Sequence, residues 1–213
     1  GMVTDVLGEA GQIDTEILSV MAANGISASF SGEVLKEADR IPPELSGDVL
    51  ARILEKGGRQ DLRAVRMMTI DGDDARDLDD AVSIEKTSEG FYRLGVHIAD
   101  VSAYVPEGSS LDVEALAWGT SVYFPDRVAP MLPTRISNGI CSLNAGEDRL
   151  ALTVFMDIDG QGEVRKHRLT ESVIRVTKRA TYKEAESILF LRGAAGAETT
   201  VRMPEGYNRA LQD

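Results

Sequence analysis

Ten residues of this chain, 71–80 (DGDDARDLDD), carry six carboxylates and one guanidinium, a local net charge of −5. Carboxylates this close disfavour one another's ionisation unless a cation neutralises them, and hard divalent cations such as Mg²⁺ prefer oxygen ligands. Asp71 and Asp77 would lie about 20 Å apart in an extended chain, so sharing one ion requires the chain to turn back, which the glycine after Asp71 permits. Asp77 and Asp79 would point to one side and Asp80 to the other, so these three converge only on an irregular loop or a twisted strand end. Composition alone leaves two interpretations open, a metal site and a solvated acidic turn between two strands.

Other metal chemistries fit the sequence poorly. The calcium-loop pattern fails because, counted from Asp71, Ala75 and Arg76 occupy the positions of a ligand and of the obligatory glycine. The two histidines are far apart in the sequence and Cys141 is the only cysteine, which argues against zinc and excludes a disulfide framework. A lone cysteine is typical of a reducing compartment, and we expect a cytoplasmic protein.

The overall composition is that of an ordinary globular protein. Of the 213 residues 43% are apolar and 27% charged, which excludes a disordered or fibrous chain. The 23 Lys+Arg against 35 Asp+Glu give a net charge of −12, and a field of this sign disfavours a nucleic-acid binder that relies on charge alone. No run approaches the roughly 20 apolar residues that span a bilayer, so no membrane partner is expected.

Hydrophobic periodicity and turn signals predict an α+β fold, with helices flanking a mixed, mainly antiparallel sheet. Residues 1–61 are predicted to be helical: one helix capped by Asp14 and closed by Asn24-Gly25, one over 33–39, and one capped by Ser46. The predicted strands are 64–70, 81–85, 91–99, 122–124, 150–158 and 163–176, the last two forming a hairpin around Asp159-Gly160. Further helices are predicted over 111–118, capped by Ser110, and from a capping box at 181–184 to Leu191, followed by a loop over 193–200.

The stretch that contains the acidic segment closely resembles the catalytic motif of the RNase II/RNase R family of exoribonucleases. Five blocks stand in the order expected of that family, which makes the resemblance specific. They are 69–72 (TIDG) with 77–82 (DLDDAV), 96–102 (VHIADVS), 119–125 (GTSVYFP) with 130–133 (PMLP), 137–144 (SNGICSLN), and 148–150 (DRL). The resemblance covers roughly residues 62–191, and residues 1–61 are similar to the linker that follows a cold-shock-type domain in RNase R-like proteins. It implies that residues 62–213 are the N-terminal portion of an RNB catalytic domain and that the chain is a fragment of a longer protein.

The resemblance implies a processive enzyme that hydrolyses single-stranded RNA from the 3′ end and releases nucleoside 5′-monophosphates. Mg²⁺ is the implied cofactor, with Mn²⁺ as a substitute and two ions in the complete site. The family's four active-site aspartates match Asp71, Asp77, Asp79 and Asp80, and the most critical of them matches Asp79, whereas the other two aspartates of the segment match none. Tyr123 matches an aromatic residue that stacks on a nucleotide near the 3′ end. Without this context Tyr123 would be interpreted as a half-buried tyrosine on a short strand.

Four other features carry competing interpretations. His97, amid apolar residues, is interpreted as a hydrogen-bonded core residue rather than a catalytic one, and Trp118 as core rather than a stacking platform. Asp100, directly after a predicted strand, either contacts the site or caps a turn. Residues 162–183 carry seven basic and two acidic side chains, which either line an RNA path or form a solvated strand face, and we favour the solvated face.

The extent of the resemblance bears on activity. The family's catalytic domain is much longer than residues 62–213 and has an arginine, a glutamate and a second stacking aromatic residue further downstream. The fragment by itself is therefore expected to be weakly active or inactive, because the transition-state charge would lack partners. The alternative hypothesis is a non-catalytic RNA-binding or regulatory module with the same fold, and the presence of all four motif aspartates argues against it. The sequence does not distinguish enzymes that stall at duplexes from those that unwind them.

Overall fold

A computed structural model describes residues 2–3, 6–27 and 29–190 of the chain. The chain divides into two compact units: Gly1–Ile41 together with Tyr104–Ser137, here called the helical unit, and Pro42–Ala103 together with Asn138–Asp213, here called the sheet unit. The division does not follow the order of the sequence, because residues 104–137 lie between two neighbouring strands of the sheet unit yet belong to the helical unit.

The helical unit contains the helices α1 (Ile13–Ala23), α2 (Gly32–Arg40) and α4 (Ser110–Trp118) and the hairpin of β5 (Val122–Tyr123) and β6 (Val128–Ala129). Serine hydroxyls cap two of these helices, Ser31 on α2 and Ser109 on α4, each accepting an N–H of the first turn. The predicted caps Asp14 and Ser110 are wrong, since both residues lie inside the first turn of their helices. A carboxylate there is still favoured by the positive end of the helix dipole without capping it.

Trp118 is engaged in packing within the helical unit. It is half-buried at the end of α4, and its ring stacks on Phe30 with ring centroids 5.1 Å apart and planes inclined by 10°. Offset stacking of this kind stabilises a pair of aromatic side chains beyond the area they bury. The indole thus takes part in packing, as the core interpretation predicts, although it is only half-buried.

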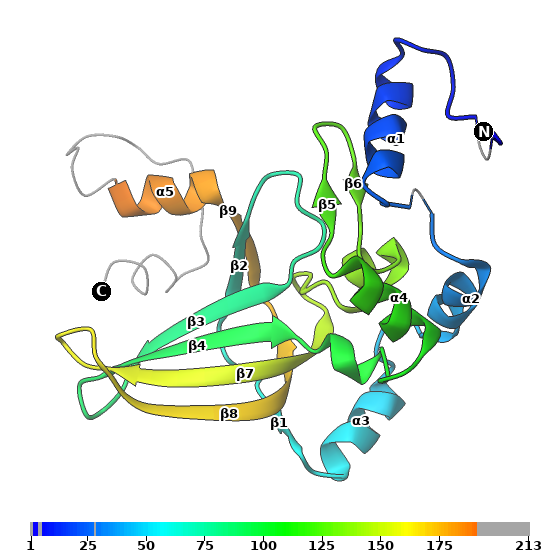
Figure 1. Ribbon diagram of the computed structural model, residues 1–213. Helices are drawn as coiled ribbons and strands as arrows, with labels where there is room; N and C mark the ends of the chain where they lie inside the picture. The colour runs from blue at the N-terminus through cyan, green and yellow to red at the C-terminus, as the bar shows by residue number, and fades with distance from the viewer. Residues whose placement is uncertain (1, 4–5, 28, 191–213) are drawn as a thin grey trace. The chain divides into compact units, whose positions relative to one another are not determined.

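The sheet unit is built on a seven-stranded sheet with the order β1-β8-β7-β4-β3-β2-β9 (Figure 1). The strands are β1 (Arg59–Asp61), β2 (Met68–Asp71), β3 (Asp80–Lys86), β4 (Tyr92–Ala99), β7 (Asp148–Ile158), β8 (Val164–Arg175) and β9 (Lys178–Thr181). The two outer pairs, β1 with β8 and β2 with β9, are parallel and the inner pairs are antiparallel. The unit also contains the helices α3 (Gly47–Glu55) and α5 (Tyr182–Phe190) and the short helix η1 (Val101–Ala103). The irregular turn η2 (Ile136–Ile140) spans the point in the sequence where the helical unit ends and the sheet unit resumes. The predicted mixed, mainly antiparallel fold with flanking helices is confirmed.

Local signals in the sequence predicted several elements of this unit correctly. Ser46 caps α3 by accepting the N–H of Val49, and β7 and β8 form the expected hairpin. The capping box of α5 is present in full: the Thr181 N–H donates to a Glu184 carboxylate oxygen (2.9 Å), and the Glu184 N–H donates to the Thr181 hydroxyl (3.1 Å). The predicted end of this helix at Leu191 and the loop over 193–200 lie outside the described residues.

Other elements differ from the prediction for reasons of tertiary structure. The predicted strand 64–70 is shorter, because a turn closed by the Val65 N–H and the Leu62 carbonyl (3.0 Å) precedes β2. β1 and β9 were not predicted at all. Both are too short to show a period, and each pairs in parallel with a strand far away in sequence, Arg59 with Glu171 in one pair and Met68 with Lys178 in the other.

Alternate residues of the strands face opposite sides of the sheet. On one side α5 covers the β2–β9 edge, where Ile188 packs with Met68 and Ala180. On the other side a row of buried polar side chains crosses four strands, from Ser83 to His97 (3.0 Å), from His97 to Thr153 (2.9 Å) and from Thr153 to Ser172 (2.7 Å). His97 is fully buried and hydrogen-bonded through both ring nitrogens, so its interpretation as a core residue is confirmed. None of the described helices is long and apolar enough to cross a membrane.

Candidate functional site

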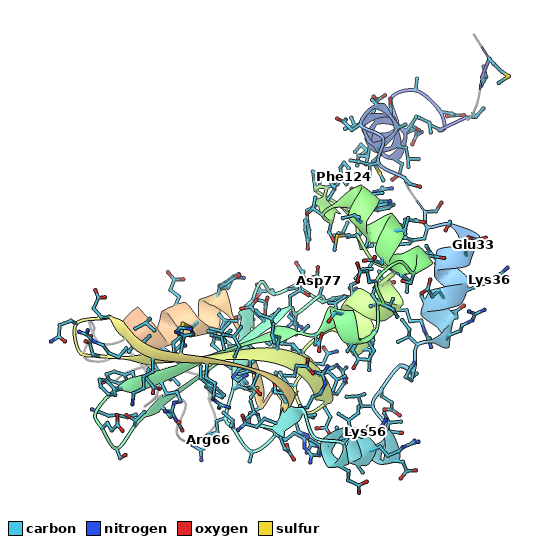
Figure 2. All side chains as sticks on the ribbon, turned by 60° about the horizontal axis from the view of Figure 1, so that its bottom comes forward. Glu33, Lys36, Lys56, Arg66, Asp77 and Phe124 are labelled. Carbon is cyan, nitrogen blue, oxygen red and sulfur yellow. The ribbon has the colours of Figure 1, made fainter. Side chains whose placement is uncertain are left out.

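The acidic segment forms the loop that joins β2 to β3 (Figure 1). Asp71 is the last residue of β2 and Asp80 the first residue of β3. Between them Leu78 is buried, with 1% of its surface exposed, and it anchors the loop between Asp77 (labelled in Figure 2) and Asp79. The Asp79 carbonyl accepts the N–H of the last residue of β4 (2.9 Å), which ties the end of the loop to the sheet. The segment is therefore an irregular loop at strand ends, the geometry that convergence of these side chains requires.

The four motif carboxylates act on one another electrostatically. Partial burial raises the pKa of Asp71, and the charges of Asp80 and Asp77 raise it further, against the opposing effect of the Arg179 guanidinium. Partial burial also raises the pKa of Asp79, together with the charges of the other three carboxylates. Since both groups resist ionisation in the same negative surroundings, a nearby cation would stabilise them. The charges of Asp77 and Asp80 thus oppose the ionisation of both Asp71 and Asp79, and the four residues together are here called the acidic cluster.

The cluster has the donor chemistry of a hard-cation site. Oδ2 of Asp71 is buried and has no hydrogen-bond partner in the described structure, which is costly for a carboxylate oxygen unless a donor or a cation meets it. All the candidate ligands are carboxylate oxygens, the type that Mg²⁺ prefers. Among residues 2–3, 6–27 and 29–190, however, no three histidine, cysteine, aspartate or glutamate side chains are arranged so that they could hold one ion. The residues fit Mg²⁺ by their chemistry, and the set of metal ligands stays a prediction.

Ser142 and Leu143, far along the chain, hold the second half of the loop. The fully buried Ser142 hydroxyl donates to the Arg76 carbonyl (2.7 Å) and accepts the N–H of Leu78 (3.2 Å). The Leu143 N–H donates to the Leu78 carbonyl (2.9 Å). Arg149, itself buried, in turn holds the serine, because its Nε donates to the Ser142 carbonyl (2.8 Å). Sequence reasoning assigned no role to Ser142 or Arg149, although their place in the family-like blocks 137–144 and 148–150 was an available signal.

Asp100 holds a turn and a strand together. It accepts hydrogen bonds from Arg59 Nη2 (2.5 Å) and from the Ser102 hydroxyl in η1 (2.6 Å). Burial opposes its ionisation, but the hydrogen bonds from Ser102 and Arg59 outweigh burial and lower the pKa of Asp100. Of its two predicted roles, the observed contacts are those of the turn.

Cys141 is a buried free thiol whose pKa is raised to about 12 by burial and by the charge of Asp79, so it is a poor nucleophile.

The basic segment 162–183 is largely neutralised by carboxylates of the chain itself. The ion pairs are Arg165–Asp159 (2.5 Å), Lys166–Glu89 (3.4 Å), Arg175–Asp148 (2.7 Å), Lys178–Glu184 (3.4 Å) and Lys183–Asp73. Arg168 donates to Gln60 (2.8 Å) and lies over the ring of Phe155, 5.1 Å from its centroid. These contacts agree with a solvated strand face and leave little uncommitted positive charge for an RNA path.

Tyr123 is an exposed aromatic residue of the helical unit, whereas the four aspartates lie in the sheet unit. It stands on β5, pairs with Val128 and has 66% of its surface exposed. The N–H of Phe124 (labelled in Figure 2) donates to the Arg127 carbonyl (2.8 Å) and closes the hairpin. Tyr123 is therefore on a short strand, as expected, but it is more exposed than the half-buried tyrosine of the alternative interpretation.

A family model described as the RNB domain matches residues 59–206, and the chain belongs to this family. Ribonuclease R 2 of Lactococcus lactis is 43% identical over 189 residues, 89% of this chain and 28% of that protein. Ribonuclease R of Thermotoga maritima is 47% identical over 191 residues, 88% of this chain and 26% of that protein. A solved structure of Mycoplasma genitalium RNase R in complex with ribose methylated single-stranded RNA is similar with a TM-score of 0.81 at 28% identity, covering 92% of this chain and 29% of that one. The resemblance inferred from the motifs is confirmed, and the chain spans less than a third of the length of these relatives.

Proposed function

We propose that this chain is part of a Mg²⁺-dependent exoribonuclease that degrades single-stranded RNA processively from the 3′ end and releases nucleoside 5′-monophosphates. The observation that carries the proposal is the cluster of four motif aspartates, whose mutual repulsion and unpartnered Asp71 oxygen a divalent cation would relieve. Membership of the RNB-domain family and the relatives named Ribonuclease R support the proposal. The buried lone thiol of Cys141 suits the reducing cytoplasm that we propose as its location.

The four motif aspartates would hold the metal, with two ions in the complete site. When bound, such ions supply activation of a water for attack on the phosphodiester and stabilisation of the leaving 3′-oxygen. The chain's own residues position the carboxylates: Leu78 anchors the loop in the core, and the Ser142 hydroxyl fixes the backbone on both sides of Asp77. We assign the most critical role to Asp79, whose ionisation is opposed by all three of the others.

The test uses the full-length protein that contains this chain, incubated with 5′-labelled single-stranded RNA and Mg²⁺. We expect a descending ladder or a short limit product from the unmutated protein and no cleavage by Asp79→Asn, with RNA binding retained. Asp74→Asn is the matched control, because Asp74 is an exposed carboxylate of the same loop outside the motif set. A normal rate for Asp79→Asn would show that the role assigned to Asp79 is wrong. RNA that is bound but left intact by the unmutated protein would support the non-catalytic module instead.

Tyr123 is proposed to stack on a base of the RNA. Stacking on an aromatic ring is tolerant of sequence and contributes about 1–3 kcal/mol per base, as an enzyme that accepts any RNA requires. Tyr123→Ala should therefore weaken single-stranded RNA binding, measured by fluorescence anisotropy, by roughly 5- to 150-fold. Tyr182→Ala removes a similarly exposed ring, 64% exposed at the start of α5, and should leave binding unchanged. Equal losses in both variants would contradict a specific role for Tyr123.

A further inference from the structure

One arginine of the basic segment contacts the acidic loop directly. Arg179 lies on β9, which runs parallel to β2 in a register that pairs Arg179 with Thr69 and Thr181 with Asp71. From this strand its Nη2 reaches three backbone carbonyls of the loop: those of Gly72 (3.2 Å), Asp73 (3.1 Å) and Ala75 (2.7 Å). A nitrogen with two hydrogens that meets three acceptors is fully committed to the loop.

These contacts shape the first half of the loop. Because three carbonyls converge on one nitrogen, the chain from Gly72 to Ala75 wraps around the guanidinium. The Ala75 N–H donates back to the Gly72 carbonyl (3.2 Å), which closes a turn. The chain reverses at this point, and a reversal between Asp71 and Asp77 is the condition for both to reach one ion. Lys183 adds a second basic contact, from its Nζ to the Asp73 carboxylate.

Arg179 also differs from the other basic residues of the segment in the kind of partner that it bonds. Its neighbours in sequence pair with carboxylate side chains, whereas the recorded hydrogen bonds of Arg179 go to main-chain oxygens, whose positions define the course of the loop. Ser142 holds the residues just after this turn through the Arg76 carbonyl and the Leu78 N–H. The loop is therefore held at two points, by Arg179 over 72–75 and by Ser142 over 76–78.

We propose that Arg179 is a positioning residue of the acidic site: it holds the turned-back first half of the loop, so that Asp71 meets the other three motif aspartates around a divalent cation. This inference rests on the proposed function for its metal. The recorded hydrogen bonds of Arg179 go to the backbone of the loop, so its role is positioning rather than catalytic. Residues that hold metal ligands in place commonly change metal affinity by 10–100-fold when they are removed. A lysine offers a positive charge without the planar set of donors, so Arg179→Lys should retain part of the effect.

The experiment compares the full-length protein with Arg179→Met, Arg179→Lys and a control, Arg175→Met. The control removes another arginine of the same segment, one bonded to both carboxylate oxygens of Asp148 (2.7 and 2.9 Å) and not to the loop. Two readouts need no catalysis: Mn²⁺ binding followed by electron paramagnetic resonance without RNA, and hydrogen exchange of the amides of residues 72–78. Steady-state kinetics with single-stranded RNA over a range of Mg²⁺ concentrations gives kcat and KM.

We expect Arg179→Met to bind Mn²⁺ about 10-fold or more weakly, to exchange faster over residues 72–78, and to lose kcat at low Mg²⁺ while KM for RNA stays unchanged. Arg179→Lys should lie between Arg179→Met and the unmutated protein, and raised Mg²⁺ should restore part of the rate. Arg175→Met should match the unmutated protein in Mn²⁺ affinity and in exchange over these residues.

Unchanged Mn²⁺ affinity and unchanged exchange in a folded Arg179→Met protein would overturn the proposal, and so would an equal loss of affinity in Arg175→Met. Failure of the proposed function would give a different set of results. If the unmutated protein binds Mn²⁺ but leaves RNA intact, the nuclease proposal fails, while the exchange and affinity differences between the two arginine variants still support the positioning role.

Discussion

Lowering the pH is expected to destabilise the sheet unit through one residue, His97. Its ring is fully buried between Ser83 and Thr153 and lies edge-on to Phe155, with ring centroids 5.9 Å apart. Burial lowers the pKa of His97 from 6.5 to about 4, because the charged imidazolium cannot be solvated there. The folded chain therefore keeps this histidine neutral over a pH range in which the unfolded chain protonates it.

The sign and the size of the effect follow from the two pKa values. Because the pKa is lower in the folded state, the stabilisation is complete above pH 6.5 and is lost as the pH falls through about 4. The full window corresponds to about 3 kcal/mol, of which about 2 kcal/mol is lost between pH 7 and pH 5. A loss of about 2 kcal/mol is a large share of the unfolding free energy, which is typically 5–15 kcal/mol for a folded domain.

The measurement is urea unfolding of this chain and of His97→Gln at pH 7 and at pH 5. The variant should be less stable at pH 7, and its stability should fall between the two pH values by about 2 kcal/mol less than that of the unmutated chain. All other titratable groups are common to both proteins, so their contributions to the pH dependence cancel in the comparison. An equal pH dependence in the two proteins would refute the assignment of this effect to His97.

Two further substitutions test the packing of the acidic loop and of the sheet. Ser142→Ala should lower the free energy of urea unfolding by about 2–4 kcal/mol, since it leaves both the Leu78 N–H and the Arg76 carbonyl without their partner. A loss below about 0.5 kcal/mol would show that these two hydrogen bonds do not stabilise the fold. Gly95→Ala should lower the unfolding free energy by about 1–3 kcal/mol in the same assay, because the added Cβ would clash with the Ser83 hydroxyl and lie 2.9 Å from His97 Nε2.

Features encoded in a few adjacent residues were predictable from the sequence. The serine cap of α3, the capping box of α5 and the hairpin of β7 and β8 each depend on residues close together in the chain, and all three form as predicted. The choice of Ser110 as a cap failed because Ser109 beside it is an equally good capping residue, and local preference does not distinguish the two. The choice of Asp14 failed because α1 already begins at Ile13, and Gln12 at its N-cap position makes no side-chain capping bond.

The sequence by itself determined the family to which the chain belongs and predicted which residues carry the chemistry, since the order of the aspartates and of the blocks after them is written in the chain. Only the tertiary structure decided how the acidic loop is held. Arg179 stands 107 residues from Gly72, and Ser142 stands 66 residues from Arg76. These contacts exist because β9 pairs in parallel with β2 and because the Leu143 N–H donates to the Leu78 carbonyl, which sets Ser142 against the loop. Contacts between residues this far apart in sequence form only when the whole sheet assembles, because its packing must offset the entropy lost in closing long loops. No local pattern of residues therefore predicts them.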